Sequence, residues 1–463
     1  MAASQIRGML DVKTLKQMVE KDEIETVLSV FPDMYGRLMG KRITGRFFVD
    51  DVLDASIHVC DYLLACDMEM EPVPGYAFTS WSDGYGDVRL IPDLKTLRIA
   101  SWHEKTALVL CDVYNEEQNV LTEVAPRTIL RKQVDRATKM GYIARAGSEL
   151  ELYVFKDSYS QAADKTYINL EPVGKYIEDY HILQGTKEEF VIGEIRHHLD
   201  RSGVPVEFSK GEWGPGQQEI NLRYADFLEM ADRHAIYKHA VKEIAWQKEC
   251  AITFMSKWDE RFAGSSMHLH ASLWDKSGLH SLFPGEEEMG PIHASPLFRW
   301  FLGGWMAHVR EIFPFYAPYP TSYKRFVAGS FAPTGIAWSY DNRTAGFRIV
   351  GHGPALRIEC RAPGADANPY LAFAATLAAG LDGIENQIEP PPIFEGDVYA
   401  AEELPHVPKT LNEAIGELAD SAWARETFGK DVIEHYLHFF RTEQRKFDEV
   451  VTNWERERYF ERA

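Results

Sequence analysis

Hydrophobic and polar residues follow different periods along the chain, and these periods predict its elements. In residues 11–22, Leu15 and Val19 fall on one side of a helix opposite lysines and glutamates, which predicts a short amphipathic helix. Residues 24–31 and 38–43 are largely apolar runs separated by a turn containing Pro, Asp and Gly, which predicts two strands. The N-terminal part is therefore expected to consist of strands with a few helices.

Longer helices are expected in the second part of the chain. Pro126 suits the first turn of a helix that continues through RTILRKQVDRATKMGY. Residues 227–247 and 369–386 also show helical apolar spacing, and strands are predicted between these helices. A chain of 463 residues is longer than one ordinary hydrophobic core accommodates. We therefore expect two domains, residues 15–115 and residues 122–463.

The bulk composition excludes several classes of protein. A net charge of −20 and a pI near 5.3 argue against nucleic acid or an anionic membrane as a partner. The five cysteines are scattered and form no CxxC pair, so neither a disulfide framework nor a thiolate zinc site is indicated. The start, MAASQIRGMLDVK, lacks the apolar region of a signal peptide, and no apolar run is long enough to cross a bilayer. We expect a cytoplasmic location.

The stretch from residue 321 to residue 373 runs against this acidic background. It concentrates five arginines, namely Arg325, Arg343, Arg348, Arg357 and Arg361. On a strand, the alternation of Arg357, Glu359 and Arg361 places two guanidinium groups and one carboxylate on the same face. Guanidinium groups bind phosphate and carboxylate oxygens, and a carboxylate between two of them stays ionised and can hold a metal. A surface strand with an internal salt bridge would show the same pattern.

Three further segments present carboxylates or histidines at strand or turn spacing. Each segment alone also fits a solvated acidic surface or a buried histidine. Together with Glu359 they supply six candidate ligands: Glu149, Glu151, Glu212, Glu219, His268 and Glu359. Oxygen ligands dominate this set, which favours Mg²⁺ or Mn²⁺ over zinc. Two or more divalent ions beside arginines indicate ATP-dependent chemistry.

Several long motifs resemble those of the glutamine synthetase family, in family order. They are GSELELYVF, KGEWGPGQQE, GSSMHLHASL, NRTAGFRI, LRIECR and ANPYLAFAA, and the match runs from about residue 24 to the end of the chain. The resemblance implies an α+β fold, with a β-grasp-like N-terminal domain and a catalytic domain built on a curved antiparallel sheet. It also implies a homo-oligomer, a dodecamer of two stacked hexameric rings with active sites between subunits.

The resemblance also implies a role for each matching residue. One divalent ion would bind Glu151, Glu212 and Glu219, and another would bind Glu149, His268 and Glu359. The residues that hold glutamate or the transferring phosphoryl group would be Gly264, Arg325, Arg343 and Arg361. The residues near ATP would be Glu207, Lys257, Ser272, Arg348 and Arg357.

The chain departs from ammonia-using glutamine synthetases where the nucleophile binds. The flap motif reads AGSFAP, with Phe331 at the position of the family's glutamate, and Ala263 replaces the Asn before the glycine of the glutamate loop. The N-terminal loop reads AFTSWSDGYGD, and Asp87 keeps its only recognisable acidic position. Ammonium needs negative charge and a base, so an acceptor amine bulkier than ammonia is expected. This pattern resembles the γ-glutamyl-amine ligases.

The expected reaction has two steps. The glutamate side-chain carboxylate attacks ATP to give γ-glutamyl phosphate, and an amine then displaces phosphate. The expected catalytic residues are Asp87, Arg325, Phe331 and Arg343, and the expected amine-side residues are Trp81, Tyr167, Trp213 and Phe331. These rings favour a small or aromatic monoamine, such as aniline, ethanolamine or an alkylamine. The alternatives are an ammonia-using glutamine synthetase, a γ-glutamylpolyamine synthetase and a non-catalytic oligomeric paralogue.

Overall fold

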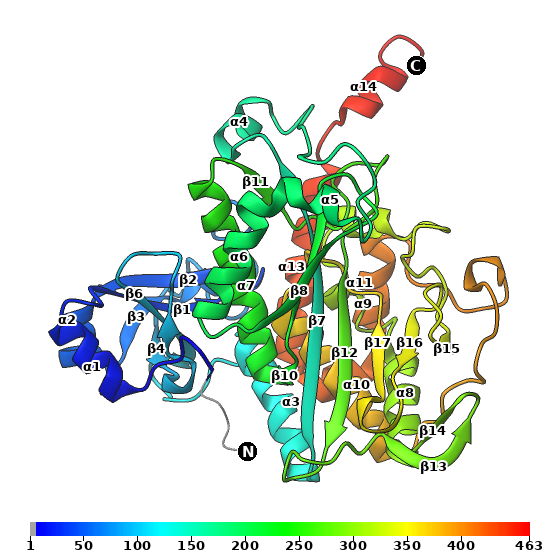
Figure 1. Ribbon diagram of the computed structural model, residues 1–463, viewed down its shortest axis with the longest axis horizontal. Coiled ribbons are helices and arrows are strands. Elements are labelled where there is room, and N and C mark those ends of the chain that lie inside the picture. The colour runs from blue at the N-terminus through cyan, green and yellow to red at the C-terminus, as the bar shows by residue number, and fades with distance from the viewer. Residues whose placement is uncertain (1–5) are drawn as a thin grey trace.

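The computed structural model describes residues 6–463, which form two main sheets and a separate two-stranded hairpin (Figure 1). The first five residues of the start discussed above lie outside this range. Helix α1 begins the described part, and it matches the predicted amphipathic helix with Leu15 and Val19 buried. None of the helices in residues 6–463 is both long enough and apolar enough to cross a membrane.

The first sheet contains the strands expected near the N-terminus. Its order is β2-β1-β6-β4-β3, with β5 paired to β6, and β1 runs parallel to β6. The N-terminal elements are α1 (Val12–Glu20), β1 (Thr26–Pro32), β2 (Leu38–Thr44), α2 (Gly45–Phe47), β3 (Ile57–Cys60), β4 (Asp87–Pro92), β5 (Arg98–Ile99) and β6 (Thr106–Asn115). The turn between β1 and β2 uses Gly36 at φ +78°, a conformation that glycine adopts without steric cost.

The second sheet carries most of the candidate ligands. Its order is β15-β16-β17-β12-β7-β9-β8, with β10 and β11 both paired to β7. The pairs are antiparallel except for β15 with β16. Its strands are β7 (Ile143–Phe155), β8 (Val206–Gly211), β9 (Gln217–Leu222), β10 (Ala225–Asp226), β11 (Ala251–Thr253), β12 (Met267–Trp274), β15 (Trp338–Tyr340), β16 (Phe347–Val350) and β17 (Arg357–Cys360).

Long helices pack beside this sheet and make the main core. Helices α7 and α10 have the predicted bounds, and α10 is almost entirely buried between its neighbours. The helices are α3 (Pro126–Met140), α4 (Tyr159–Asp164), α5 (Ile182–Gly185), α6 (Glu189–Arg201), α7 (Phe227–Gln247), α8 (Pro296–His308), α9 (Phe313–Tyr316) and α10 (Pro369–Asn386). The hairpin strands are β13 (Pro284–Met289) and β14 (Ile292–Ala294).

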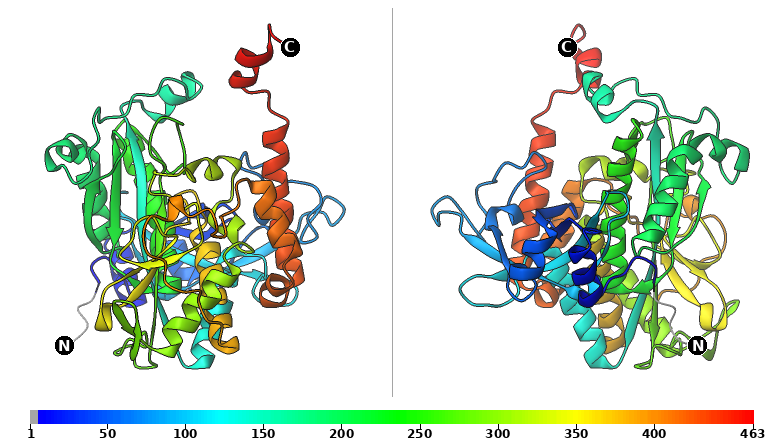
Figure 2. Two further views of the ribbon diagram at one scale, coloured as in Figure 1. Left: turned by 90° about the vertical axis from the view of Figure 1, so that its right-hand side faces the viewer. Right: turned by 60° about the vertical axis from the view of Figure 1, so that its left-hand side comes forward.

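The C-terminal region is helical. Its helices are α11 (Leu411–Asp420), α12 (Ala422–Phe428), α13 (Lys430–Asp448) and α14 (Asn453–Tyr459). Helix α14 projects from the body of the chain in each view (Figure 2). The last strand of the first sheet ends at Asn115 and α3 begins at Pro126. The division into domains 15–115 and 122–463 stays a prediction.

Candidate active site

Three adjoining cavities lie at the strands of the second sheet and at the loops next to them. The carboxylate cavity, about 550 Å³, is lined by the candidate metal ligands other than Glu359 and by four arginines. The Arg357 cavity, about 500 Å³, adjoins it through the shared residues Glu149, Phe208 and Asn221. The Lys257 cavity, about 600 Å³, adjoins it elsewhere, and the two share Trp213, Ala263, Ser330 and Phe331. A reaction in the carboxylate cavity could therefore draw substrates from both neighbours.

The first group of ligands comes from three points on neighbouring strands. Glu151 on β7 lies opposite Glu219 on β9 in the antiparallel register. Glu212 follows β8 directly, at the start of the Gly-Pro-Gly turn that leads into β9. One ligand atom from each of these three carboxylates lies within 4.8 Å of the others. We call Glu151, Glu212 and Glu219 the carboxylate trio.

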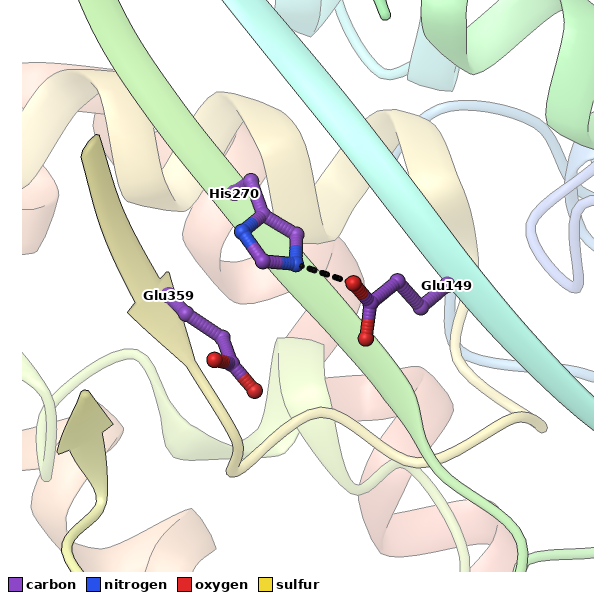
Figure 3. A group of neighbouring side chains, drawn as sticks. All are labelled: Glu149, His270 and Glu359. Carbon is purple, nitrogen blue, oxygen red and sulfur yellow. Dashed lines mark hydrogen bonds and ion pairs between the residues drawn. The ribbon is translucent and has the colours of Figure 1, made fainter. Parts of the chain in front are cut away.

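The second group of ligands surrounds Glu149 (Figure 3). Nε2 of His270 lies 2.8 Å from Oε1 of Glu149, and Nδ1 of His268 lies 3.3 Å from Oε2 of the same residue. Nδ1 of His268 also lies 3.7 Å from Oε1 of Glu359. Two sets have their ligand atoms within 4.8 Å of one another, namely Glu149 with His270 and Glu359, and Glu149 with Glu219 and His268. The six predicted ligands thus lie in groups that share residues, but within residues 6–463 the predicted set of Glu149, His268 and Glu359 is not one of the groups that meet this distance.

The donor chemistry of these groups fits hard divalent cations. Five of the seven candidate donors are carboxylates, counting His270 with the six predicted residues. Magnesium and manganese prefer such oxygen ligands, and the imidazoles extend the fit toward manganese. His270 is a ligand candidate that our predicted set omitted. The alternation of His268 and His270 on β12 was the signal that could have found it, because both side chains point to one face.

Two arginines hold Glu359, but one of them is not the arginine that strand spacing suggested. Nη1 of Arg361 donates to Oε1 of Glu359 over 2.6 Å, and Nη1 of Arg348 donates to Oε2 over 2.8 Å. Arg348 reaches Glu359 because the two residues are opposite each other in the β16–β17 register. Nε of Arg357 instead donates to Nδ1 of His270 over 3.2 Å. Arg357 therefore alternates with Glu359 on β17 as expected but pairs with His270 instead of Glu359.

The surroundings push the pKa values of these carboxyl groups in opposite directions. Burial disfavours ionisation of Glu359, but Arg361 and the two histidines outweigh it and lower the pKa of Glu359 to about 2. Burial also raises the pKa of Glu149, but His270 and His268 lower it by more, so the pKa of Glu149 lies well below its usual range. Burial and the neighbouring Glu212 raise the pKa of Glu151 to about 7. Burial, Glu212 and Glu149 raise the pKa of Glu219 well above normal. The site thus carries unbalanced negative charge around the trio.

A lysine that the sequence did not single out lies at this trio. The ammonium group of Lys210 on β8 forms ion pairs with Glu212 and, over 3.8 Å, with Oε2 of Glu219. Burial lowers the pKa of Lys210, but the carboxylates of Glu219 and Glu212 raise it by more, so the net shift is upward. The spacing of two residues between Lys210 and Glu212 was a signal that could have indicated this pair, whereas the approach of Lys210 to Glu219 follows from the pairing of β8 with β9.

The residues expected to hold glutamate line one wall of the carboxylate cavity. Gly264, Arg325, Arg343 and Arg361 all do so. A Cβ atom at Gly264 would lie 2.4 Å from Cγ of Arg325, so only glycine allows this close packing. The Nε atoms of Arg325 and Arg361 are buried and have no hydrogen-bond partner in residues 6–463. Buried guanidinium groups with free donors suit an anionic substrate.

The residues expected near ATP divide among the cavities. Glu207, Ser272 and Arg357 line the Arg357 cavity, together with the rings of Tyr224 and Trp274. Arg348 lines the carboxylate cavity beside it. The structure does not bring Lys257 to these residues, because its ammonium group lies in the Lys257 cavity and bonds to the carbonyl of Phe262.

An aromatic pair lies where the carboxylate and Lys257 cavities meet. The rings of Phe331 and Trp213 pack edge to face with centroids 5.7 Å apart. Phe331 adopts φ +60°, a rare conformation for a bulky residue, and its carbonyl accepts a bond from Nη2 of Arg361 over 3.3 Å. The flap segment around Phe331 is thus tied to an arginine that also holds Glu359. This pair puts apolar surface beside the carboxylates.

Three predicted residues lie elsewhere within this chain. Trp81, Asp87 and Tyr167 line none of the three cavities formed by residues 6–463. Trp81 is 74% exposed and Tyr167 is 69% exposed. Asp87 begins β4 in the first sheet. A single chain therefore does not bring these three side chains to the carboxylates.

Comparisons with known proteins agree with this geometry. Residues 123–459 match the family model described as glutamine synthetase, catalytic domain. A gamma-glutamylethanolamide synthetase from Streptomyces coelicolor is 45% identical over 98% of this chain and 96% of its own length. A glutamate–isopropylamine ligase from Pseudomonas sp. is 36% identical over 96% of this chain and 97% of its own length. A solved structure of a GmaS–ADP complex has a TM-score of 0.84 at 29% identity, covering 96% of this chain and 99% of that one.

Proposed function

The chain belongs to the glutamine synthetase family, and from this premise we propose that it ligates the γ-carboxylate of glutamate to a small amine using ATP. The family match confirms the α+β fold class and the resemblance read from the motifs. The chain is an ATP-dependent carbon–nitrogen ligase, as are the relatives named above. The aromatic pair of Phe331 and Trp213 is the observation that carries the choice of an amine over ammonia.

In the first step, the glutamate γ-carboxylate attacks the γ-phosphorus of ATP, giving γ-glutamyl phosphate and ADP. Arg325 and Arg361 would hold the glutamate, because their buried Nε donors are free for an anion. Arg357, with Glu207 and Ser272, would hold the nucleotide in the adjoining cavity. Divalent ions bound by the trio and by the ligands around Glu149 would neutralise charge that develops on the phosphoryl oxygens.

In the second step, the amine nitrogen attacks the acyl phosphate, phosphate leaves, and the nitrogen loses a proton to give the γ-glutamylamide. Phe331 and Trp213 would pack against the carbon atoms of the amine and exclude water from the acyl phosphate. An aromatic ring can attract an ammonium ion, but unlike the missing flap carboxylate it cannot accept the proton that ammonium must lose before it attacks. An alkyl or aryl body is stabilised there by about 25 cal/mol for each Å² of buried apolar area.

The active site is proposed to be completed by a second copy of the chain. Trp81 and Asp87 lie on the N-terminal part, outside the cavities of their own chain. They could reach the amine side of a site only if they belong to a neighbouring subunit. This supports the proposal of a ring-shaped homo-oligomer, a dodecamer of two hexameric rings. The cytoplasm is the proposed location, in keeping with five cysteines that form no disulfide.

The proposal is tested by phosphate release from ATP and glutamate with ethanolamine, isopropylamine, aniline, putrescine or ammonium as acceptor. A small monoamine should give a kcat/KM well above that of ammonium, and Glu219→Ala should release no phosphate with any acceptor. Equal efficiency with ammonium would restore an ordinary glutamine synthetase. A clear preference for putrescine would favour a polyamine ligase. No turnover with any amine, with metal bound, would favour a non-catalytic paralogue.

A further inference from the structure

Lys210 places a positive charge inside a group of carboxylates that is proposed to bind a divalent ion. Its ammonium group pairs with Oε1 of Glu212 and lies 3.8 Å from Oε2 of Glu219. The contact is built into the fold, because Lys210 and Glu219 are opposite each other in the β8–β9 register. The side chain of Lys210 is only 15% exposed. Lys210 is therefore an internal counter-ion of the trio rather than a mobile surface residue.

An ammonium group and a divalent ion cannot both hold the same carboxylate oxygen without strong repulsion. Magnesium binds oxygen at about 2.0–2.1 Å, so an ion on Glu212 would lie within a few ångströms of the lysine nitrogen. Like charges at such distances repel strongly in a partly buried site. Lys210 must then move away from Glu212 when the trio binds a divalent ion.

The ammonium group of Lys210 has a second partner, which it contacts at the same time as the carboxylates. Its Nζ atom lies 4.6 Å from the centroid of the Tyr180 ring. The face of a tyrosine ring attracts a cation, and this attraction does not depend on the carboxylates. Tyr180 is 64% exposed, so its ring borders solvent on one side and the trio on the other. A lysine that leaves Glu212 can therefore keep its contact with the ring.

We propose that Lys210 is a tethered cation that fills the carboxylate trio in the metal-free protein and is displaced by the divalent ion that binds there. The inference rests on the proposed metal assignment and deepens it. Displacement of a resident charge weakens binding of that ion, so the trio has a lower affinity than its three carboxylates alone would confer. The ligands around Glu149 do not contact Lys210 directly, apart from the shared Glu219.

The test is a titration of the full-length protein with Mn²⁺ alone, in which free Mn²⁺ is followed by electron paramagnetic resonance. Lys210→Met should tighten one class of Mn²⁺ sites by about tenfold or more, since a unit charge is removed from beside the ion. Lys210→Arg, which keeps the charge, should show no such gain. The matched control is Lys187→Met, because Lys187 also lies over a tyrosine ring, at 5.6 Å from Tyr176, but contacts no trio residue.

A double-mutant cycle ties the gain to the trio. In a Glu151→Gln background the trio lacks one ligand, so Lys210→Met should no longer tighten Mn²⁺ binding. The wild-type chain allows an independent measurement, which does not depend on how the variants fold. Mn²⁺ should increase acetylation of Lys210 by acetic anhydride, measured by mass spectrometry, and should leave acetylation of Lys187 unchanged.

The outcomes separate this inference from the proposed function. If Mn²⁺ binds but Lys210→Met leaves its affinity unchanged or weakens it, Lys210 is not a competitor and the inference fails alone. The same holds if Mn²⁺ leaves Lys210 acetylation unchanged. If the wild-type protein binds no Mn²⁺, the metal assignment fails and this inference fails with it.

Discussion

Removing the charge of Glu359 and removing that of Glu151 should change the stability of the metal-free protein in opposite directions. Both are buried glutamates of the candidate metal site. Glu359 is bonded by Arg348 and Arg361, whereas Glu151 lies near Glu212 with no arginine or lysine in salt-bridge contact within residues 6–463. Glu359→Gln should therefore destabilise the metal-free protein, and Glu151→Gln should stabilise it.

The magnitudes follow from the pKa values. A pKa of about 2 for Glu359, against an ordinary value of 4.5, corresponds to about 3 kcal/mol in favour of the folded protein when the group is ionised. A pKa of about 7 for Glu151 corresponds to about 3 kcal/mol against the folded protein above that pH. Glutamine cannot accept every hydrogen bond that Ser266 and Gln217 donate to Glu151, so the gain from Glu151→Gln should be roughly 1–2 kcal/mol.

The pH dependence has a definite sign for each group. Glu151 has a raised pKa, so between pH 4.5 and about 7 the folded protein binds more protons than the unfolded chain. Its contribution to stability therefore falls as the pH rises through that window, and Glu151→Gln should remove this slope. Glu359 has a lowered pKa, so its contribution is complete above about pH 4.5 and is lost only as the pH falls toward 2.

The assay is urea unfolding in EDTA at pH 6 and pH 8, followed by circular dichroism. The control is Glu287→Gln, since Glu287 pairs with Arg299 at 46% exposure and should change stability by less than about 0.5 kcal/mol. With Mg²⁺ present, both active-site variants should lose the stabilisation that the ion gives to the wild-type protein. If both variants shift stability in the same direction without metal, the charge distribution described for the site is wrong.

Three further predictions concern the substrates. Phe331→Glu should raise the ratio of ammonium to amine turnover by roughly tenfold or more, because a carboxylate can bind ammonium and accept its proton; an unchanged kcat/KM ratio would argue against a role for Phe331 in acceptor choice. Gly264→Ala should raise the KM for glutamate and destabilise the protein by about 1–3 kcal/mol, because the new Cβ would lie 2.4 Å from Cγ of Arg325 and 2.7 Å from the carbonyl oxygen of Ser256. A normal KM together with a normal unfolding midpoint would contradict this prediction. Arg357→Ala should raise the KM for ATP in initial-rate assays and leave that for glutamate nearly unchanged, because Arg357 lines only the nucleotide-side cavity; equal increases in both would show that the cavities are not separate sites.

The local pattern of the sequence was enough to predict several of the elements and most of the candidate ligands. Helices α7 and α10 have the bounds that their apolar spacing indicated, because burial on a helix repeats with a fixed period. Alternate residues of a strand share a face, so the sequence alone predicts that Glu149 and Glu151 lie on the same face of β7. The family motifs then related these segments to one another, although they are far apart in the chain.

Tertiary structure decided which charges meet. Arg348, not Arg357, lies beside Glu359, because strand register rather than spacing along one strand sets cross-strand neighbours. Lys257 lies in a cavity that shares no lining residue with the Arg357 cavity, and Lys210 reaches Glu219 through the pairing of β8 with β9. Spacing within one segment carries information about that segment's own faces. The register between segments depends on the packing of the whole sheet, so these contacts became visible only in the folded chain.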